Sequence, residues 1–136
     1  MPGPLAFGAN CGTGASDILR TVLGFAAQGT ERPIISKGNA GIPKFVDGHI
    51  HYDGTPDLMA EYAVLARACG ARIIGGCCGT TAAHLSAMRA ALESAPADAA
   101  APDLDKIATR LGPFSSASDG SDSDGTPDRP ARRRRR

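Results

Sequence analysis

The sequence predicts an α/β fold in which short parallel strands are covered by helices. Over residues 4–95, short apolar runs alternate with longer segments whose apolar residues recur at helical spacing. The resulting order is strand, helix, strand, helix, strand, helix. The apolar runs are continuous rather than alternating, which is typical of buried strands in a parallel sheet. Right-handed crossover connections are expected to join them.

Three strands are expected, each leading into a turn or loop. Residues 4–9 form the first strand, residues 33–36 the second and residues 72–76 the third. The loop after the second strand covers residues 37–43. Residues 44–54 form a longer connection to which the pattern assigns no secondary structure.

Three helices are expected, and their ends carry recognisable signals. Ser16 is the expected N-cap of the first helix, and Gly29 is the expected residue just past its end. Thr55 caps the second helix, with Pro56 at its first helical position. The third helix covers residues 82–94.

The chain changes character after residue 96, so we expect a division between residues 1–96 and residues 97–136. The second part reads as a linker and a charged tail, in which residues 104–111 form one or two helical turns. From Gly112 on there are too few apolar residues to offset the entropy of ordering, which predicts disorder. The tail is acidic and then abruptly basic, with six arginines at or after Arg129.

Length and charge exclude several classes of protein. The chain has 136 residues, which suits one domain and is too short for a complete (β/α)8 barrel of about 250 residues. A formal net charge of +1 gives no global field toward nucleic acid or membranes. No apolar run approaches the roughly 18 residues of a membrane span, and no signal-peptide pattern opens the sequence. We therefore expect a cytoplasmic protein.

The cysteines are the residues that point most directly to chemistry. Cys11 follows the first expected strand, and Cys77 and Cys78 follow the third. Because the carboxyl ends of parallel strands lie on one side, the three thiols are expected to converge there. Three protein ligands with a fourth position open is the pattern of a catalytic zinc site. Adjacent cysteines can face one ion only if the backbone turns between them, which the flanking glycines permit.

The residues alone leave alternatives open. The adjacent pair could instead be two buried structural thiols beside a glycine-rich turn or, less favoured, a vicinal disulfide. Cys69 lies on a helical stripe and is expected in the core. His49 and His51 could form a second metal site, but two solvent-facing loop histidines are the favoured interpretation. His84 is expected on a helix surface, with a place near the cysteines as the alternative.

Three motifs together resemble the homocysteine S-methyltransferase family. They are GANC at residues 8–11, GNAGIP at residues 38–43 and GGCCGTT at residues 75–81. The resemblance covers about residues 4–95. The family includes betaine–homocysteine methyltransferase and the homocysteine-binding module of cobalamin-dependent methionine synthase.

The resemblance implies a zinc-dependent methyl transfer to homocysteine, giving methionine. Cys11, Cys77 and Cys78 match the family's zinc ligands, and the homocysteine sulfur would bind as the fourth. Zinc coordination deprotonates a thiol, so the bound thiolate could attack the methyl group of a donor. Betaine, S-methylmethionine and methylfolate are all compatible donors.

A second group of residues has weaker support as part of the substrate site. Asn10 lies beside the first cysteine, and Asn39, Ala40 and Gly41 lie in the loop after the second strand. At the same end of the sheet, they are expected to help shape the homocysteine pocket.

The resemblance also implies that the chain is incomplete. Residues 1–96 would be the sixth to eighth βα units of a (β/α)8 barrel, with the first five units absent. A three-stranded sheet leaves exposed edges. We therefore expect a fragment or split part that is inactive alone and needs the N-terminal half of the barrel or self-association.

An alternative interpretation is a non-catalytic zinc-binding or interaction module. In it, the arginine-rich tail, residues 132–136, would bind nucleic acid or acidic surfaces. A solvated tail is favoured, because nearby acidic residues compete for the arginines. Nucleic acid is therefore not an expected partner, and neither is a membrane.

Overall fold

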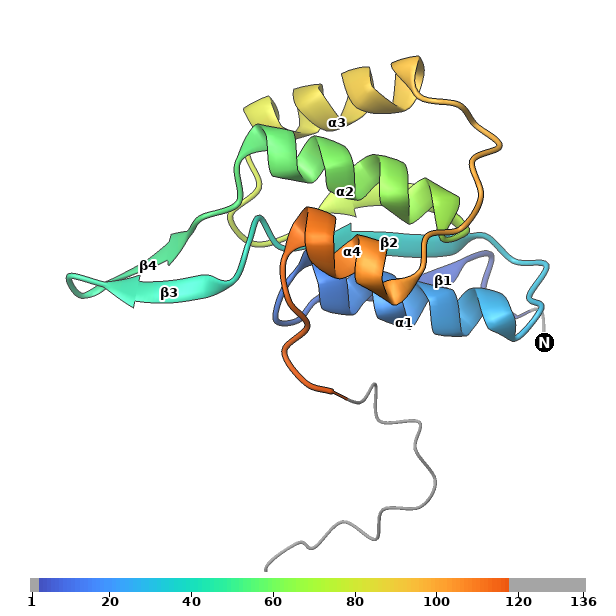
Figure 1. Ribbon diagram of the computed structural model, residues 1–136, viewed down its shortest axis with the longest axis horizontal. Coiled ribbons are helices and arrows are strands. Elements are labelled where there is room, and N and C mark those ends of the chain that lie inside the picture. Colours follow the sequence, from blue (N-terminus) through green and yellow to red (C-terminus); the bar gives the residue numbers. More distant parts are fainter. Residues whose placement is uncertain (1–2, 118–136) are drawn as a thin grey trace, which may run out of the picture.

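The structure is a computed structural model that describes residues 3–117. The elements of this part, shown in Figure 1, follow one another as β1 (Phe7–Cys11), α1 (Ala15–Ala27), β2 (Ile34–Gly38), β3 (Pro43–Val46), β4 (His49–Tyr52), α2 (Pro56–Ala68), β5 (Ala71–Gly76), α3 (Ala82–Ser94) and α4 (Leu104–Leu111). None of the helices in residues 3–117 has the length and apolar character that crossing a membrane requires.

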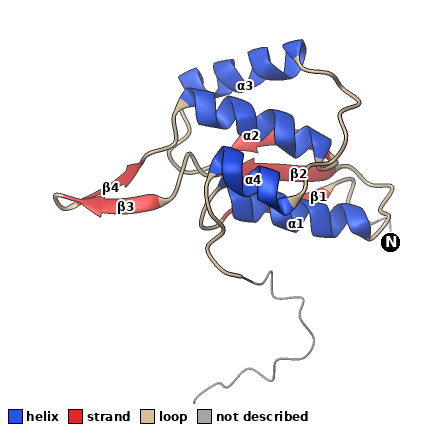
Figure 2. Cartoon of the chain, viewed as in Figure 1, coloured by secondary structure: helices blue, strands red, loops and turns tan. Residues whose placement is uncertain are grey.

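Strands β1, β2 and β5 form one parallel sheet in that order (Figure 2). This confirms the predicted α/β class with parallel strands. The register pairs Cys11 with Gly38 and Gly38 with Gly76, so the three strands reach their carboxyl ends together. The carboxyl edge of such a sheet is where ligands of α/β proteins bind.

Helices cover one face of the sheet. Helix α1 contacts β1 and β2, α2 contacts β5 and α1, and α3 packs along α2. In β2, Ile34 and Ser36 are buried, whereas Lys37 is exposed. In β5, Ile73 is 47% exposed. Because successive strand residues point to opposite faces, these exposed side chains mark a face that none of the described helices covers.

The core between the helices and the sheet is centred on Tyr62 of α2, which is fully buried. Its hydroxyl accepts a hydrogen bond from the Gly38 backbone N–H at 2.9 Å and lies 2.6 Å from the Ser36 Oγ. Burial raises the pKa of Tyr62 to about 12, so the phenol stays neutral. The side chain thus fastens α2 to the carboxyl end of β2.

A β-hairpin occupies the segment to which the sequence pattern assigned no structure. Strands β3 and β4 pair in antiparallel fashion and project away from the body of the molecule (Figure 1). Asp47 and Gly48 form the turn with φ angles of +49° and +81°. Positive φ at both central residues is the geometry of a type I′ turn, for which Asp-Gly is a preferred sequence.

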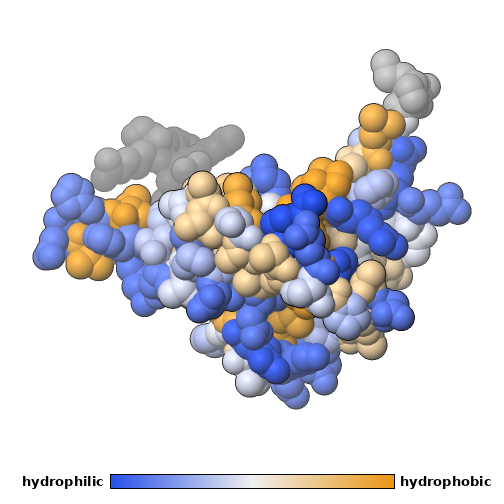
Figure 3. Space-filling view, turned by 90° about the horizontal axis from the view of Figure 1, so that it is seen from above, coloured by the Kyte–Doolittle hydropathy of each residue, from blue (hydrophilic) through white to orange (hydrophobic). Residues whose placement is uncertain are grey.

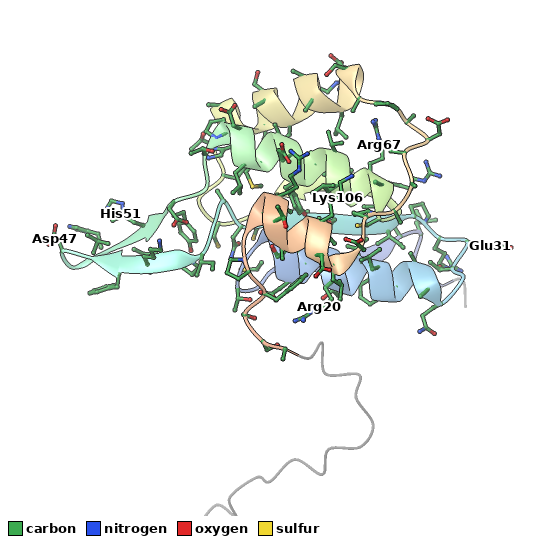
Figure 4. The ribbon with its side chains drawn as sticks, in the orientation of Figure 1. Arg20, Glu31, Asp47, His51, Arg67 and Lys106 are labelled. Atoms are coloured by element: carbon green, nitrogen blue, oxygen red, sulfur yellow. The ribbon has the colours of Figure 1, made fainter. Side chains whose placement is uncertain are left out.

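The two strands of the hairpin carry exposed apolar side chains near the turn. Phe45 is 77% exposed and Ile50 is 63% exposed. The projection is visible on the left of Figure 3, where hydrophobic residues lie beside hydrophilic ones. His51 of β4 and Asp47 of the turn are labelled in Figure 4 and lie on this hairpin.

The helix ends are partly as predicted. Thr55 caps α2 by accepting the Leu58 backbone N–H at 3.1 Å, and Gly29 follows α1 with a φ of +70°. Helix α1, however, begins at Ala15, with Gly14 rather than Ser16 at its N-cap. The Ser16 hydroxyl is instead used in a long-range contact, donating to the Gly112 carbonyl at 2.6 Å.

Helix α3 has the bounds predicted for it, and its carboxyl end is held by Arg67 of α2. The last carbonyls of a helix lack partners within the helix. The Arg67 guanidinium donates to the carbonyl of Leu92 at 2.9 Å and to those of Ala95 and Pro96 at 3.0 Å. Figure 4 shows Arg67 reaching from α2 toward the chain that leaves α3.

The segment after residue 103 returns to the body of the molecule. Helix α4 has two turns, in agreement with the helical expectation, and it buries Ile107 and Leu111 against α1 and α2. Disorder was expected from Gly112, but Phe114 lies under the Arg20 guanidinium of α1, at 4.6 Å from its ring centroid. Residues 118–136, including the arginine run, lie outside the described residues, and the division at residue 96 stays a prediction.

We predict that Tyr62→Phe lowers the free energy of unfolding by about 1–3 kcal/mol, because it leaves the buried Gly38 N–H and Ser36 hydroxyl without their partner. Chemical denaturation monitored by circular dichroism measures the change. Phe45→Leu, at the exposed hairpin tip, is the control and should change the free energy by less than about 0.5 kcal/mol. Equal stability of Tyr62→Phe and the unmodified chain would contradict the prediction.

Candidate metal and substrate site

The structure brings Cys11, Cys77 and Cys78 together, and we refer to these three residues as the thiol triad. Cys11 is the last residue of β1, and the other two follow directly after β5. Their Sγ atoms all lie within 4.8 Å of one another, and those of Cys11 and Cys78 are 3.8 Å apart. Convergence at the carboxyl edge of the sheet is what the sequence predicts.

Unusual backbone conformations turn the thiols toward each other. Cys11 has a φ of +66° and Gly12 a φ of +80°, so the chain leaves β1 in the left-handed region. This conformation costs a non-glycine residue of the order of 1–3 kcal/mol and tends to occur at functional sites. After β5, the Thr80 N–H donates to the Cys77 carbonyl at 3.2 Å, closing a turn in which Gly79 has a φ of +76°. This is the turn that two adjacent cysteines need in order to face one point.

Asn39 links the two loops that carry the thiol triad. Its Nδ2 donates to the Gly12 carbonyl at 2.9 Å, and its Oδ1 accepts the Cys78 N–H at 3.1 Å. The side chain is only 2% exposed. Ala40, which is fully buried, adds a backbone hydrogen bond from its N–H to the Cys78 carbonyl at 2.9 Å. Both residues therefore hold the Cys78 peptide in place, whereas their role in substrate binding stays a prediction.

Gly41 and Asn10 occupy different positions at the site. Gly41 has a φ of +89°, and a side chain there would collide with Asp53, so it shapes the loop through its backbone. Asn10 lies on the uncovered face, where its Nδ2 approaches the Cys77 Sγ at 3.9 Å. It is the predicted pocket residue that touches a thiol with its side chain.

Tyr52, at the end of β4, also belongs to the site, although the sequence pattern did not indicate it. Its side chain packs on the turn that follows the adjacent cysteines, where a Cβ at Gly79 would collide with the Tyr52 Cβ and Cγ atoms. The Asp47-Gly48 dipeptide was the available signal, because it predicts the hairpin that carries Tyr52. The packing of Tyr52 on Gly79, in contrast, depends on tertiary structure.

The thiols affect one another's ionisation. Desolvation raises the pKa of Cys77, but hydrogen bonds from Asn10, the Cys78 backbone and the other two thiols outweigh it and bring the pKa below its usual value. The Tyr52 hydrogen bond lowers the pKa of Cys78, but the contacts with Cys11 and Cys77 outweigh it and raise the pKa overall. The pKa of Tyr52 is raised, chiefly by the hydrogen bond with Cys78. Once one thiol is ionised, its negative charge disfavours ionisation of the next thiol. A cation bound between the sulfur atoms offsets this repulsion.

The donor set of the thiol triad fits zinc. Tetrahedral zinc with Zn–S bonds of about 2.3 Å places its sulfur ligands about 3.8 Å apart. The distance of 3.8 Å between the Cys11 and Cys78 sulfurs agrees with this, and the triad as a whole, within 4.8 Å, needs only a small contraction. Throughout residues 3–117, no other group of three potential His, Cys, Asp or Glu ligands is this close. The structure therefore gives no support to a second metal site at the hairpin histidines.

The other singled-out residues lie away from the triad's sulfur atoms. His49 and His51 are exposed, as expected, but on strand β4 rather than in a loop. Cys69 is 3% exposed, as expected for the core, and burial raises its pKa to about 12.

The expectation that His84 lies on the helix surface is wrong, because its ring is a buried structural link. His84 is 9% exposed. Its Nδ1 accepts the Thr81 N–H at 3.1 Å, and its Nε2 lies 2.7 Å from the Gly54 carbonyl. Because one partner is a donor and the other an acceptor, these contacts assign the tautomer with hydrogen on Nε2. The ring thus joins the start of α3 to the end of the hairpin.

We predict that Asn39→Ala lowers the free energy of unfolding by about 2 kcal/mol, because the Gly12 carbonyl and the Cys78 N–H both lose their partner. Denaturant titration of the metal-free chain measures the effect. Gln28→Ala removes an amide from an exposed position and serves as the control. If both variants unfold at the same denaturant concentration, Asn39 does not hold the two loops together.

Comparison with known proteins identifies the family of the chain. Residues 1–92 match the sequence profile of the family described as Homocysteine S-methyltransferase. This range includes all three strands of the parallel sheet and the whole thiol triad. The match confirms the resemblance carried by the three sequence motifs.

A curated relative supports the same assignment over a similar part of the chain. Methionine synthase of Mycobacterium tuberculosis (strain H37Rv) is 34% identical over 86 residues, which make up 62% of this chain. The chain spans 7% of the length of that relative. Because the family match covers well over half of the sequence, the chain belongs to the homocysteine S-methyltransferase family.

Proposed function

We propose that the chain provides the metal-binding part of a zinc-dependent homocysteine S-methyltransferase, with the thiol triad as the zinc ligands. The observation that carries the proposal is the convergence of three thiols within 4.8 Å at the carboxyl edge of a parallel sheet. The family name gives homocysteine as the methyl acceptor. Three cysteine ligands leave one position in a tetrahedral zinc site, which suits the substrate thiol.

The metal and the chain have separate tasks in this proposal. When bound, zinc makes the homocysteine thiol a nucleophile at neutral pH by deprotonating a group whose pKa is otherwise about 8.5. The chain holds the ligands. Asn39 fixes the spacing of the two loops, while the Asn10 Nδ2 offers a polar hydrogen to the sulfur of Cys77.

We further propose that residues 1–96 are the last three βα units of a (β/α)8 barrel. Parallel strands in chain order, helices on one face and an uncovered opposite face support this. The uncovered face carries Asn10 and the exposed Lys37 in register. The first five units would come from another polypeptide or another part of a longer one, and turnover would require them. Self-association through the open edges of β1 and β5 is the other way to cover the sheet.

The methyl donor, the cellular location and the alternative function are also proposals. The methyl donor is proposed to be betaine, S-methylmethionine or methylfolate. A cytoplasmic location stays a prediction. The alternative of a non-catalytic zinc-binding or interaction module rests on the arginine run, which lies outside the described residues.

We predict that the full chain binds one zinc ion per molecule and that Cys77→Ser loses it, because two thiols cannot replace three in a site of this kind. Metal analysis after dialysis against a weak chelator measures the stoichiometry. Cys69→Ala is the matched control, since Cys69 is the fourth cysteine and lies buried away from the triad. Undiminished zinc in Cys77→Ser, or loss of zinc in Cys69→Ala alone, would refute the proposed site.

A further inference from the structure

The His84 ring uses both of its nitrogen atoms to join two segments beside the thiol triad. Its Nδ1 accepts the backbone N–H of Thr81, which lies three residues after Cys78, at 3.1 Å. Its Nε2 donates to the carbonyl of Gly54, two residues past the end of β4, at 2.7 Å. The neutral ring has one lone pair, on Nδ1, and the Thr81 N–H occupies it. The ring therefore acts on the thiol triad through these two partners and not as a metal ligand.

Gly54 connects His84 to the loop that follows β2. The Gly54 N–H donates to the Ala40 carbonyl at 2.8 Å. A Cβ atom at position 54 would collide with the Ala40 carbonyl group, so the two backbones are packed as closely as glycine allows. A displacement of Gly54 therefore displaces Ala40 as well.

Ala40 leads back to the thiol triad and closes a ring of contacts. Its N–H donates to the Cys78 carbonyl at 2.9 Å. Ala40 is fully buried and His84 is 9% exposed, so these hydrogen bonds are largely shielded from water. The turn after the adjacent cysteines is thereby held at two points, the Cys78 carbonyl and the Thr81 N–H. We call this set of contacts the histidine circuit; its members are Cys78, Ala40, Gly54, His84 and Thr81.

We propose that His84 is a positioning residue for the metal site, whose neutral ring closes the histidine circuit and holds the Cys78 sulfur at its spacing from Cys11. This inference rests on the proposed function and adds to it a residue outside the ligand motifs. The Cys11 and Cys78 sulfurs are 3.8 Å apart, which is the spacing that tetrahedral zinc requires. If the Cys78 peptide shifts, this spacing changes. Residues that orient metal ligands commonly change metal affinity by about 10–100-fold when replaced.

Three substitutions separate the two hydrogen bonds of the His84 ring. His84→Gln keeps an N–H donor at the position of Nε2, and with it the bond to Gly54. His84→Asn is too short to reach Gly54 but keeps an acceptor for the Thr81 N–H. His84→Leu removes both bonds.

Titration of the full chain with Co²⁺, followed by competition with Zn²⁺, measures the metal affinity of each variant. The visible and charge-transfer bands of cobalt also report on the sulfur ligands and on the geometry around the ion. Met88→Ala is the control for stability, because Met88 is buried on the same helix and forms no bond of the histidine circuit. His51→Leu is the control for removal of an imidazole, because His51 is exposed on the hairpin. Circular dichroism shows that each variant is folded under the conditions of the titration.

We expect His84→Asn and His84→Leu to bind Co²⁺ and Zn²⁺ at least about 10-fold more weakly and to change the cobalt bands, because Cys78 is no longer held. His84→Gln and both controls should stay close to the unmodified chain. Unchanged affinity and bands in His84→Leu overturn the proposal, even if that variant melts at a lower temperature.

Two further outcomes would also contradict the role given to His84. An equal loss of affinity in Met88→Ala overturns it, because lower stability alone would then explain the result. If His84→Gln binds metal as weakly as His84→Leu, the connection through Gly54 is not what positions Cys78. A missing cobalt–thiolate band in the unmodified chain overturns the proposed zinc site itself, and this inference with it.

Discussion

The two hydrogen bonds of the Asn39 side chain are the contacts on which the site depends. Cys11 and the adjacent cysteines come from strands that are not neighbours, since β2 lies between them. Asn39 follows β2 directly and binds the loop after β1 with its Nδ2 and the loop after β5 with its Oδ1. A buried amide with both groups satisfied tolerates little displacement. Because the three strands end in register, the loops that follow β1 and β5 lie near each other. Asn39 sets the separation between these two loops.

The surrounding structure supports this link from both sides. Tyr62 hydrogen-bonds to the last residue of β2, immediately before Asn39, and so fixes the start of the loop from within the core. On the other side, Tyr52 of the hairpin packs on Gly79 in the cysteine loop, and the Gly54 N–H donates to the Ala40 carbonyl. The left-handed conformation of Cys11 persists because these contacts over-determine the position of its neighbours. Repulsion among ionised thiols then makes the assembled site selective for a cation.

Local patterns predicted the parts of the fold that local interactions determine. The apolar runs located the three parallel strands, and the cysteines after them located the triad. The hairpin was missed because its alternation is weak, although Asp47-Gly48 carried the signal. Burial of His84 was missed because its histidine ring takes the place that glutamate commonly holds in a capping box. The packing of Tyr52 on Gly79 joins residues brought together only by tertiary structure, which no sequence period records.

The central claim is that three thiols hold one zinc ion and leave a position for the substrate thiol. Zinc X-ray absorption on the full chain, with and without homocysteine, tests it most directly. The account predicts three sulfur neighbours at about 2.3 Å in the chain alone and four after homocysteine is added. A zinc ion with nitrogen and oxygen neighbours only, or a sulfur count that homocysteine leaves unchanged, would contradict it.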